Sequence, residues 1–384
     1  MTKGEDRTSH REGRPQPVAP PLELTTVWQC ASVEQAERLL AGEVPGDVYR
    51  RDGHPGARRL TELWCRRHEA RWAMATSSGM AALAALLLAR LRPGDHVLLA
   101  EELYGRTQRL FQEEGSRWGI TVDHVDPCTL ESLEQAWRPE SRLLLVETIS
   151  NPRLRVVDVE RLARWCHDRG VLLAVDHTLA TSTSFRPLEL GADYVVESLT
   201  KFGNGHSDAV LGVVGGRDDC HARFDDVVRT WGMVASPLDC WLTERGWQTL
   251  DVRSERACRT AREIAAMLKR HPSVTSVRYP GLADHPDHEV ARKQFGVRYG
   301  SMVTFTLRGG RSMVDRLAQT IPFCPSLGEA RTTFSHPRST SHRSYTPEQC
   351  QKLGIEEGTV RLSVGCEPTG EVLELVTSAL DRLD

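Results

Sequence analysis

The residues with the clearest chemical potential follow an expected strand at 194–198. Ser198 and Thr200 lead into Lys201, and a glycine-containing turn follows at 203–205. Ligands of parallel α/β sheets bind at the carboxyl ends of the strands. A desolvated lysine near other cations has a lowered pKa there, so its amine can act as a nucleophile. The same pattern also fits a surface lysine beside a turn.

Three further features carry possible ligand chemistry. Asp176 ends the apolar run 171–175; it either caps the next turn or faces a pyridinium nitrogen and keeps that ring an electron sink. Residues 77–81, SSGMA, begin a helix, where free N–H groups favour a phosphate, although an ordinary N-cap reads the same way. Tyr104 follows another strand and could stack on a flat cofactor or simply pack in the interior.

Together these features describe one ligand. A phosphate cradle, a stacking ring, a carboxylate for a ring nitrogen and an amine for an aldehyde match pyridoxal 5′-phosphate (PLP). Nicotinamide cofactors do not fit, because the chain has no GxGxxG sequence between a strand and a helix.

The elements that must position these residues alternate between helix and strand. Continuous apolar strands separated by amphipathic helices predict a mostly parallel sheet buried on both faces. The expected strands cover 96–100, 121–125, 142–147, 171–176, 194–198 and 209–214, and the helices cover 80–91, 105–118, 130–137 and 159–169.

The pattern changes after residue 245. One long helix is expected over 246–270, followed by short strands and helices that indicate a smaller α+β domain. The stretch 322–345 has little periodicity, and such a stretch inside a compact domain is often functional. We therefore predict an N-terminal tail and arm over 1–48, a PLP-binding α/β domain over 49–245 and a C-terminal domain over 246–384.

Composition narrows the class of protein. The chain has 384 residues with a net charge of −3, which argues against a nucleic-acid partner. No apolar run approaches the roughly 18 residues of a membrane span. Residues 1–21 are polar and proline-rich, so we expect a disordered tail rather than a secretory signal. The 10 scattered cysteines predict reduced thiols in a cytoplasm, and the scattered histidines predict no metal site.

From Tyr49 to the C-terminus the sequence resembles the Cys/Met-metabolism, or trans-sulfuration, family of PLP enzymes. Its members include cystathionine γ-synthase, cystathionine γ-lyase, methionine γ-lyase and cystathionine β-lyase. The resemblance rests on the ordered segments SSGMAAL, LYGRTQRLF, ETISNP, VDHT, FRPLELGADYVVESLTKFGNGHSD, RGWQTLDVR, YPGL, SLG and VRLSVGCE. It implies PLP fold type I, the fold of aspartate aminotransferase.

The resemblance also implies roles for single residues. Lys201 would hold the cofactor aldehyde and move protons, Asp176 would pair with the ring nitrogen, and Tyr104 would stack on the ring and assist proton transfer. The other implied cofactor contacts are Ser78, Gly79, Met80, Asn151, Thr178, Ser198 and Thr200, with Tyr49 and Arg51 reaching in from a neighbouring subunit. The implied substrate contacts are Arg361, which would clamp the α-carboxylate, and Tyr49, Asn151, Ser326, Leu327, Arg331 and Arg109.

The reaction implied is γ-elimination from an L-amino acid through a vinylglycine-type quinonoid intermediate. A γ-replacement transferase that joins an activated homoserine to a nucleophile is the alternative, and β-elimination is a third option. The alternative from another class is a non-catalytic binding or regulatory protein on the same scaffold. A purified protein without bound cofactor would support it. The family resemblance further implies a homotetramer, built from two dimers that share their active sites.

The sequence departs from the family pattern in one informative loop. Where the cystathionine enzymes commonly have an acidic residue, Arg331 follows the segment SLGEA. A cation there would repel a distal ammonium group and attract an anion. We therefore expect a substrate with a neutral or anionic side-chain end rather than cystathionine, unless Arg331 points to solvent or pairs with Glu329.

Overall fold

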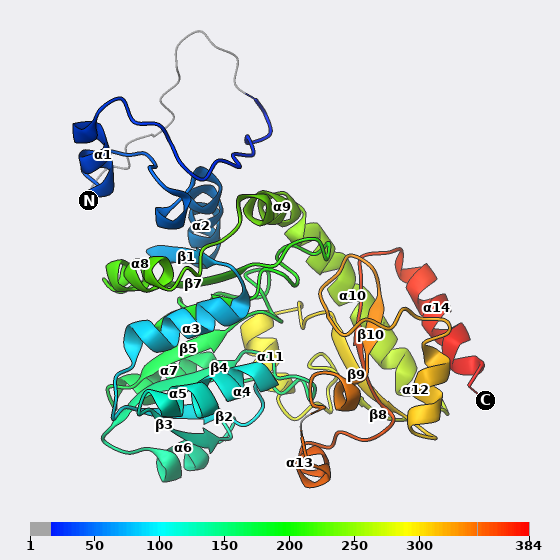
Figure 1. The fold of residues 1–384 in the computed structure, drawn as a ribbon. Coiled ribbons are helices and arrows are strands. Elements are labelled where there is room, and N and C mark those ends of the chain that lie inside the picture. Colours follow the sequence, from blue (N-terminus) through cyan, green and yellow to red (C-terminus); the bar gives the residue numbers. More distant parts are fainter. Residues whose placement is uncertain (1–16, 344, 384) are drawn as a thin grey trace.

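The computed structural model describes residues 17–343 and 345–383, so most of the predicted tail lies outside the described residues. A seven-stranded sheet has the order β1-β7-β6-β5-β4-β2-β3 (Figure 1). Its strands are β1 (Trp72–Thr76), β2 (His96–Ala100), β3 (Thr121–Val125), β4 (Ser141–Glu147), β5 (Leu172–Asp176), β6 (Tyr194–Glu197) and β7 (Gly212–Gly216).

The expectation of a mostly parallel sheet is confirmed. β3, β2, β4, β5 and β6 run parallel, so the carboxyl ends of these five strands meet at one edge. β7 pairs antiparallel with both β6 and β1. The sequence analysis missed β1, because its residues Trp72–Thr76 precede the serine-rich helix start without a clear period-two pattern.

Apolar side chains cover both faces of this sheet because consecutive strand residues point to opposite sides. Tyr194 and Val196 belong to one core cluster, and Val195 belongs to another. The helices that follow the strands are α3 (Gly79–Arg90), α4 (Gly105–Arg109), α5 (Gly115–Arg117), α6 (Leu130–Ala136), α7 (Val159–His167) and α8 (His221–Thr230), with a π-helical turn η2 (Leu110–Glu114) between α4 and α5.

A second sheet of four strands occupies the C-terminal third and has the order β10-β11-β9-β8. Its strands are β8 (Val274–Arg278), β9 (Met302–Leu307), β10 (Thr333–Ser335) and β11 (Thr359–Ser363). Its helices are α10 (Leu250–Leu268), α11 (His288–Phe295), α12 (Arg311–Leu317), α13 (Pro347–Lys352) and α14 (Thr369–Asp381), with a 3₁₀ turn η3 (Pro337–Ser339). All pairs in this sheet are antiparallel.

α10 covers most of the helix expected over 246–270, but the first two residues of that range end a separate helix. α9 (Pro237–Trp247) ends before Gln248, and α10 begins at Leu250. A helical period continues across the junction in sequence, so periodicity alone did not reveal the break. α9 packs on α2 (Pro55–His68), whereas α10 packs on α14 and β9.

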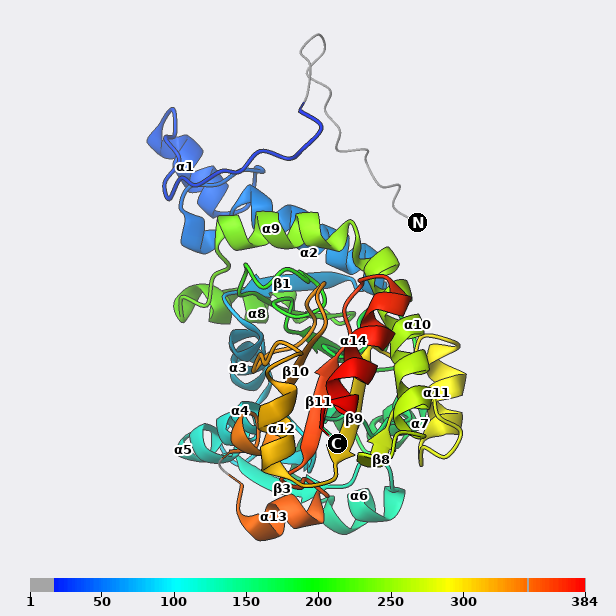
Figure 2. The same ribbon diagram turned by 90° about the vertical axis from the view of Figure 1, so that its right-hand side faces the viewer.

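The N-terminal segment stands apart from both sheets. In two perpendicular views α1 (Val33–Leu40) projects away from the seven-stranded sheet, and none of its residues is buried (Figures 1 and 2). A 3₁₀ turn η1 (Arg50–Asp52) links it to α2. The predicted domain limits at 48 and 245 stay predictions. In the described part of the chain no helix has the length and apolar character needed to cross a membrane.

Candidate active site

The carboxyl ends of β4, β5 and β6 open into a cavity of about 330 Å³, which we call the site cavity. This volume lies in the range of small-molecule pockets. The cavity brings together these predicted residues: Ser78, Gly79, Met80, Tyr104, Asn151, Asp176, Thr178, Ser198, Thr200, Lys201, Ser326, Leu327 and Arg361. Residues more than 280 positions apart in sequence therefore line one space.

Lys201 lies in the turn after β6, and its Nζ donates a hydrogen bond to Ser326 Oγ at 2.9 Å. Withdrawal from water, reinforced by the positive charge of Arg361, lowers the pKa of Lys201. Both effects favour the neutral amine, which is the form that attacks an aldehyde or accepts a proton.

Asp176 ends β5, and one carboxylate oxygen accepts a hydrogen bond from the backbone N–H of Thr178 at 3.0 Å. Burial raises the pKa of Asp176 to about 6, against the lowering effect of the Thr178 hydrogen bonds. The Thr178 hydroxyl in turn accepts a hydrogen bond from the Ser198 N–H at 2.8 Å, which ties the ends of β5 and β6 together. This carboxylate has no ion pair among the described residues, so it is available to a cationic ring nitrogen.

The start of α3 forms the anion-binding end of the cavity. Ser78 is the N-cap and accepts from the Ala81 N–H, which leaves the earlier N–H groups of the helix open. A Cβ atom added at Gly79 would come within 2.8 Å of Ser198 Cβ, so only glycine fits between the helix and the turn. The Thr200 hydroxyl lines the cavity, but its Oγ1 also accepts from the Leu211 N–H at 2.9 Å and donates to the Leu211 carbonyl at 3.2 Å.

Arg361 comes from β11 of the second sheet and is 4% exposed. Its guanidinium donates to Asn151 Oδ1 at 2.9 Å and to the Ser326 carbonyl at 3.0 Å. Its Nε is buried and has no hydrogen-bond partner among the described residues. Burial lowers the pKa of Arg361 to about 10, so the group remains cationic near neutral pH while lacking a carboxylate partner. A substrate carboxylate would satisfy this guanidinium.

Tyr104 lies at the start of α4 and is 42% exposed. Its backbone N–H donates to Glu147 Oε1 at 2.7 Å, so a buried carboxyl at the end of β4 anchors the turn that carries this ring. Burial and the neighbouring charge of Asp176 raise the pKa of Glu147 well above its ordinary value.

Arg253 of α10 clamps the turn that carries Lys201. Its guanidinium is 9% exposed and donates to the carbonyls of Phe202 at 3.1 Å and of Gly246 at 2.9 Å. Burial lowers the pKa of Arg253. Because its hydrogen-bond partners are neutral oxygens, Arg253 stabilises the backbone of this turn and does not form an ion pair.

Four predicted site residues lie outside the site cavity of the single chain. Tyr49 and Arg51 border a separate groove between the N-terminal arm and the seven-stranded sheet. Arg109 is exposed on α4 and forms a bidentate pair with Glu113, with distances of 3.0 and 2.9 Å. Arg331 is exposed and does not line the cavity. The substrate roles of Arg109 and Arg331 thus stay predictions that the geometry of one chain does not favour.

Sequence reasoning missed several residues that line the cavity. Glu147 ends a continuous apolar strand just as Asp176 does, so its position was a usable signal. Ser341 lies in the stretch 322–345, whose lack of periodicity concealed a contact with the site. The other missed lining residues are Leu83, Thr107, Ile149, Leu179, Val210 and Pro325.

These residues fit PLP on structural grounds. The close contact at Gly79 leaves an open helix start for a phosphate, Asp176 is an unpaired carboxylate, and Lys201 supplies a half-buried amine in the same cavity. Tyr104 borders this space with a half-exposed ring.

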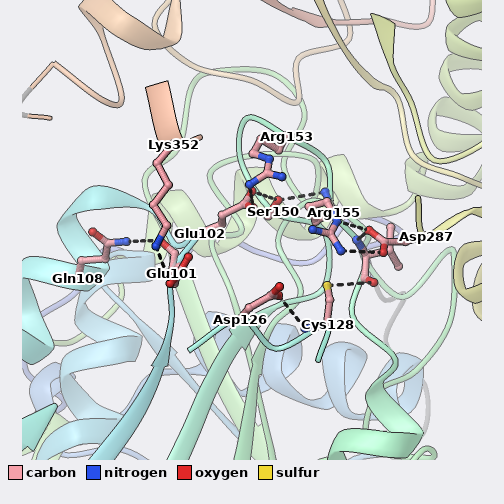
Figure 3. A network of polar contacts seen from close by, with 11 residues as sticks. Glu101, Glu102, Gln108, Asp126, Cys128, Ser150, Arg153, Arg155, Asp287 and Lys352 are labelled. Atoms are coloured by element: carbon pink, nitrogen blue, oxygen red, sulfur yellow. Dashed lines mark hydrogen bonds and ion pairs between the residues drawn. The ribbon is translucent and has the colours of Figure 1, made fainter. Parts of the chain in front are cut away.

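A second cavity of about 220 Å³ lies beside the first at the same edge of the sheet, and Glu147 lines both. Figure 3 shows its polar contacts. Arg153 pairs with Glu102 at 2.9 Å, Lys352 pairs with Glu101 at 2.9 Å, and Arg155 pairs with Asp287 at 2.6 Å. Each basic group that lines this second cavity therefore has a carboxylate partner.

Comparison with known proteins places the chain among enzymes of sulfur amino acids. Residues 4–381 match the family model described as Cys/Met metabolism PLP-dependent enzyme. The chain is 37% identical to L-methionine gamma-lyase from Fusobacterium nucleatum subsp. polymorphum, over 95% of this chain and 94% of that protein. It is also 37% identical to O-succinylhomoserine sulfhydrylase from Pseudomonas aeruginosa, over 90% of this chain and 86% of the relative.

Solved structures agree with the fold. Cystathionine gamma synthase from Xanthomonas oryzae pv. oryzae, solved in complex with cystathionine, superposes with a TM-score of 0.89 at 32% identity. The match covers 95% of this chain and 93% of that chain. The expected fold class, PLP fold type I, is confirmed.

Proposed function

Since this chain belongs to the Cys/Met metabolism family of PLP-dependent enzymes, we propose that it eliminates a γ-substituent from an L-amino acid. The observation that carries this proposal is the meeting of Lys201, Asp176 and Arg361 in one cavity. An amine, a carboxylate and an unpaired guanidinium are the groups needed to hold an aldehyde cofactor and an amino-acid carboxylate side by side.

When bound, PLP supplies an electron sink that stabilises a carbanion at the substrate Cα. Arg361 binds the α-carboxylate and so fixes the orientation of Cα. Lys201 accepts the Cα proton, because its lowered pKa makes the neutral amine available at the floor of the cavity. Lys201 would also accept the second proton, from Cβ, after passing the first to the cofactor. The half-exposed Tyr104 would give a proton to the γ-substituent as it departs.

Replacement at Cγ is the second candidate, and the sulfhydrylase relative supports it. The two reactions diverge only after the γ-substituent has left, when either water or an added nucleophile completes the reaction. The same cavity residues serve both, so geometry alone does not separate them.

The test is a panel of γ-substituted L-amino acids that includes methionine, O-succinylhomoserine and cystathionine. With PLP-loaded enzyme, elimination gives a 2-oxo acid and ammonia without any acceptor. A replacement enzyme gives a new thioether only when a thiol is added. Mass spectrometry of the products separates the two. If β-substituted amino acids assayed alongside the panel were the ones to react, and no γ-substituted one did, both candidates would be contradicted.

We also propose a distal preference for neutral or anionic side-chain ends, based on the charge of Arg331. Arg331 is exposed in the single chain, and a solvated cation discriminates only weakly, so we expect a modest preference. Equal kcat/KM for cystathionine and for smaller γ-substituted amino acids would refute the preference.

We propose further that the enzyme is a homotetramer in which Tyr49 and Arg51 complete the site of a neighbouring subunit. The support is their position on the groove beside the N-terminal arm, away from the cavity of their own chain. Mixing an Arg51→Ala variant with a Lys201→Ala variant should recover activity that neither has alone. Sedimentation analysis gives the number of subunits. We expect a cytoplasmic location, because all ten cysteines are free thiols.

A further inference from the structure

Glu147 occupies the boundary between the two cavities at the carboxyl edge of the large sheet. It ends β4 and stands in register with Asp176 on β5, so both side chains point to the same face. It lines the site cavity and the second cavity, and it is only 8% exposed. Its one hydrogen bond, from the Tyr104 N–H at 2.7 Å, uses a single carboxyl oxygen.

The charge of this carboxyl has no direct compensation. Glu102, its neighbour in the second cavity, has Arg153 at 2.9 Å and the Ser150 hydroxyl at 2.7 Å. Glu147 has no ion pair among residues 17–343 and 345–383, and its carboxyl lies beside that of Asp176 on the adjacent strand. Its cationic neighbour is Arg361, which lines the same cavity and lacks a carboxylate partner of its own.

We propose that Glu147 must carry a proton for Arg361 to bind the substrate α-carboxylate, so that binding is coupled to proton uptake at Glu147. This inference rests on the proposed function, in which Arg361 is the carboxylate site. An ionised Glu147 would compensate part of the positive charge of Arg361 and would repel an incoming anion. A protonated Glu147 does neither, and the oxygen that does not carry the proton still accepts from the Tyr104 N–H.

The sign of the coupling follows from linkage. A carboxylate bound at Arg361 neutralises the guanidinium that lowers the pKa of Glu147, so it raises the pKa of Glu147 further. Above the pKa that Glu147 has in the free site, binding of each ligand is therefore accompanied by the uptake of about one proton. The affinity for the ligand then falls about tenfold per pH unit. Below that pKa, affinity does not depend on Glu147. The charged and titratable groups that face Glu147 are Asp176, Glu102, Tyr345 and Arg361.

The experiment uses PLP-loaded enzyme and 4-(methylthio)butanoate, a carboxylate without an amino group that cannot react with the cofactor. Calorimetry at several pH values, in two buffers of different ionisation enthalpy, gives affinity and proton uptake together. We expect the wild type to take up about one proton and to lose affinity at alkaline pH. Glu147→Gln keeps an oxygen acceptor for Tyr104, so it should bind without proton uptake and without that alkaline loss.

A matched control is Glu101→Gln, which removes another carboxyl that lines the second cavity but is paired with Lys352. Proton uptake should persist in this variant, and its disappearance would overturn the assignment to Glu147. Glu147→Asp covers the case in which the glutamine variant does not fold. It should keep the proton uptake with a shifted midpoint, and an unchanged midpoint would overturn the proposal.

Failure of the proposed function has a different signature. If the carboxylate does not bind to the wild type at any pH, or if it binds to Arg361→Met as tightly as to the wild type, then Arg361 is not its site. If the carboxylate binds through Arg361 but Glu147→Gln takes up the same number of protons as the wild type, then only the present inference is overturned.

Discussion

The two cavities at the carboxyl edge of the large sheet both contain carboxylate, arginine and lysine side chains, but they differ in how charge is compensated. In the second cavity, Arg153, Arg155 and Lys352 each meet a carboxylate within 3.0 Å. In the site cavity, Lys201 and Arg361 meet only hydroxyl, amide and carbonyl oxygens. The described part of the chain leaves these two cations without counter-charges.

The difference shows how a ligand site can be told from a structural cluster. A buried cation without a counter-ion costs stability, and a ligand carrying the missing charge recovers it. The paired cations of the second cavity have no such demand, so we interpret that cluster as a support that holds the ends of β2 and β4 in place.

The largest effect should come from removing the amine. Lys201→Arg keeps the charge but replaces a deprotonable amine, so kcat should fall about 10⁴-fold or more. Borohydride reduction and peptide mapping should label residue 201 in the wild type and no residue in the variant. A modified peptide elsewhere in the wild type would place the cofactor on another lysine and remove the basis of the site.

The unpaired guanidinium should rank second. Arg361→Met removes the proposed carboxylate anchor, so kcat/KM should fall about 10²- to 10³-fold. Arg361→Lys restores charge but not the bidentate geometry, so it should recover only part of the loss. Thermal melting of Arg361→Met should remain close to that of the wild type, because this substitution removes an uncompensated buried charge. A large drop in Tm with unchanged KM would assign Arg361 to structure instead.

The paired cluster should respond in the opposite way. Glu102→Gln leaves the partly buried Arg153 without its carboxylate, so the free energy of unfolding should fall by about 1–2 kcal/mol. Activity per folded molecule should remain within about twofold, because Glu102 does not line the site cavity. Denaturant melts and steady-state kinetics on the same preparation measure both. A strong loss of kcat without loss of stability would show that the two cavities are not functionally distinct.

The smallest effect should be at the exposed loop. Arg331→Glu should change kcat/KM for methionine by about twofold or less, because the side chain is solvated and outside the site cavity. If this residue selects the distal end of the substrate, the same change should raise turnover of cystathionine several-fold. Parallel assays with both substrates decide between a specificity residue and a surface residue.

The sequence predicted most of the cofactor side of the site but less of the substrate side. Lys201 and Asp176 were identifiable because each follows an apolar strand, and strand order places such ends together. Arg361 was identified through the family resemblance, since it comes from a different sheet. Ser341 was missed because its contact with the site depends on packing between distant segments, whereas Glu147 ends an apolar strand as Asp176 does and was overlooked.

Fold prediction shows the same division. The parallel strands and their helices follow from local periodicity. The antiparallel β1 and the break between α9 and α10 depend on partners far away in sequence. The roles of Arg109 and Arg331 were inferred from the family resemblance, with a charge argument for Arg331. Neither reveals that Arg109 is paired with Glu113 or that both side chains are exposed.

The clamp formed by Arg253 has a consequence for recombination between relatives. This one side chain of α10 donates to the carbonyls of Phe202 and Gly203, in the turn that carries Lys201. It also donates to the carbonyl of Gly246 in α9. A chimera that joins the large sheet of this chain to the C-terminal third of a relative must therefore supply an arginine at the same place. Without that arginine, the turn that carries Lys201 would lose these hydrogen bonds, and the Lys201 amine would be held less firmly in the chimera.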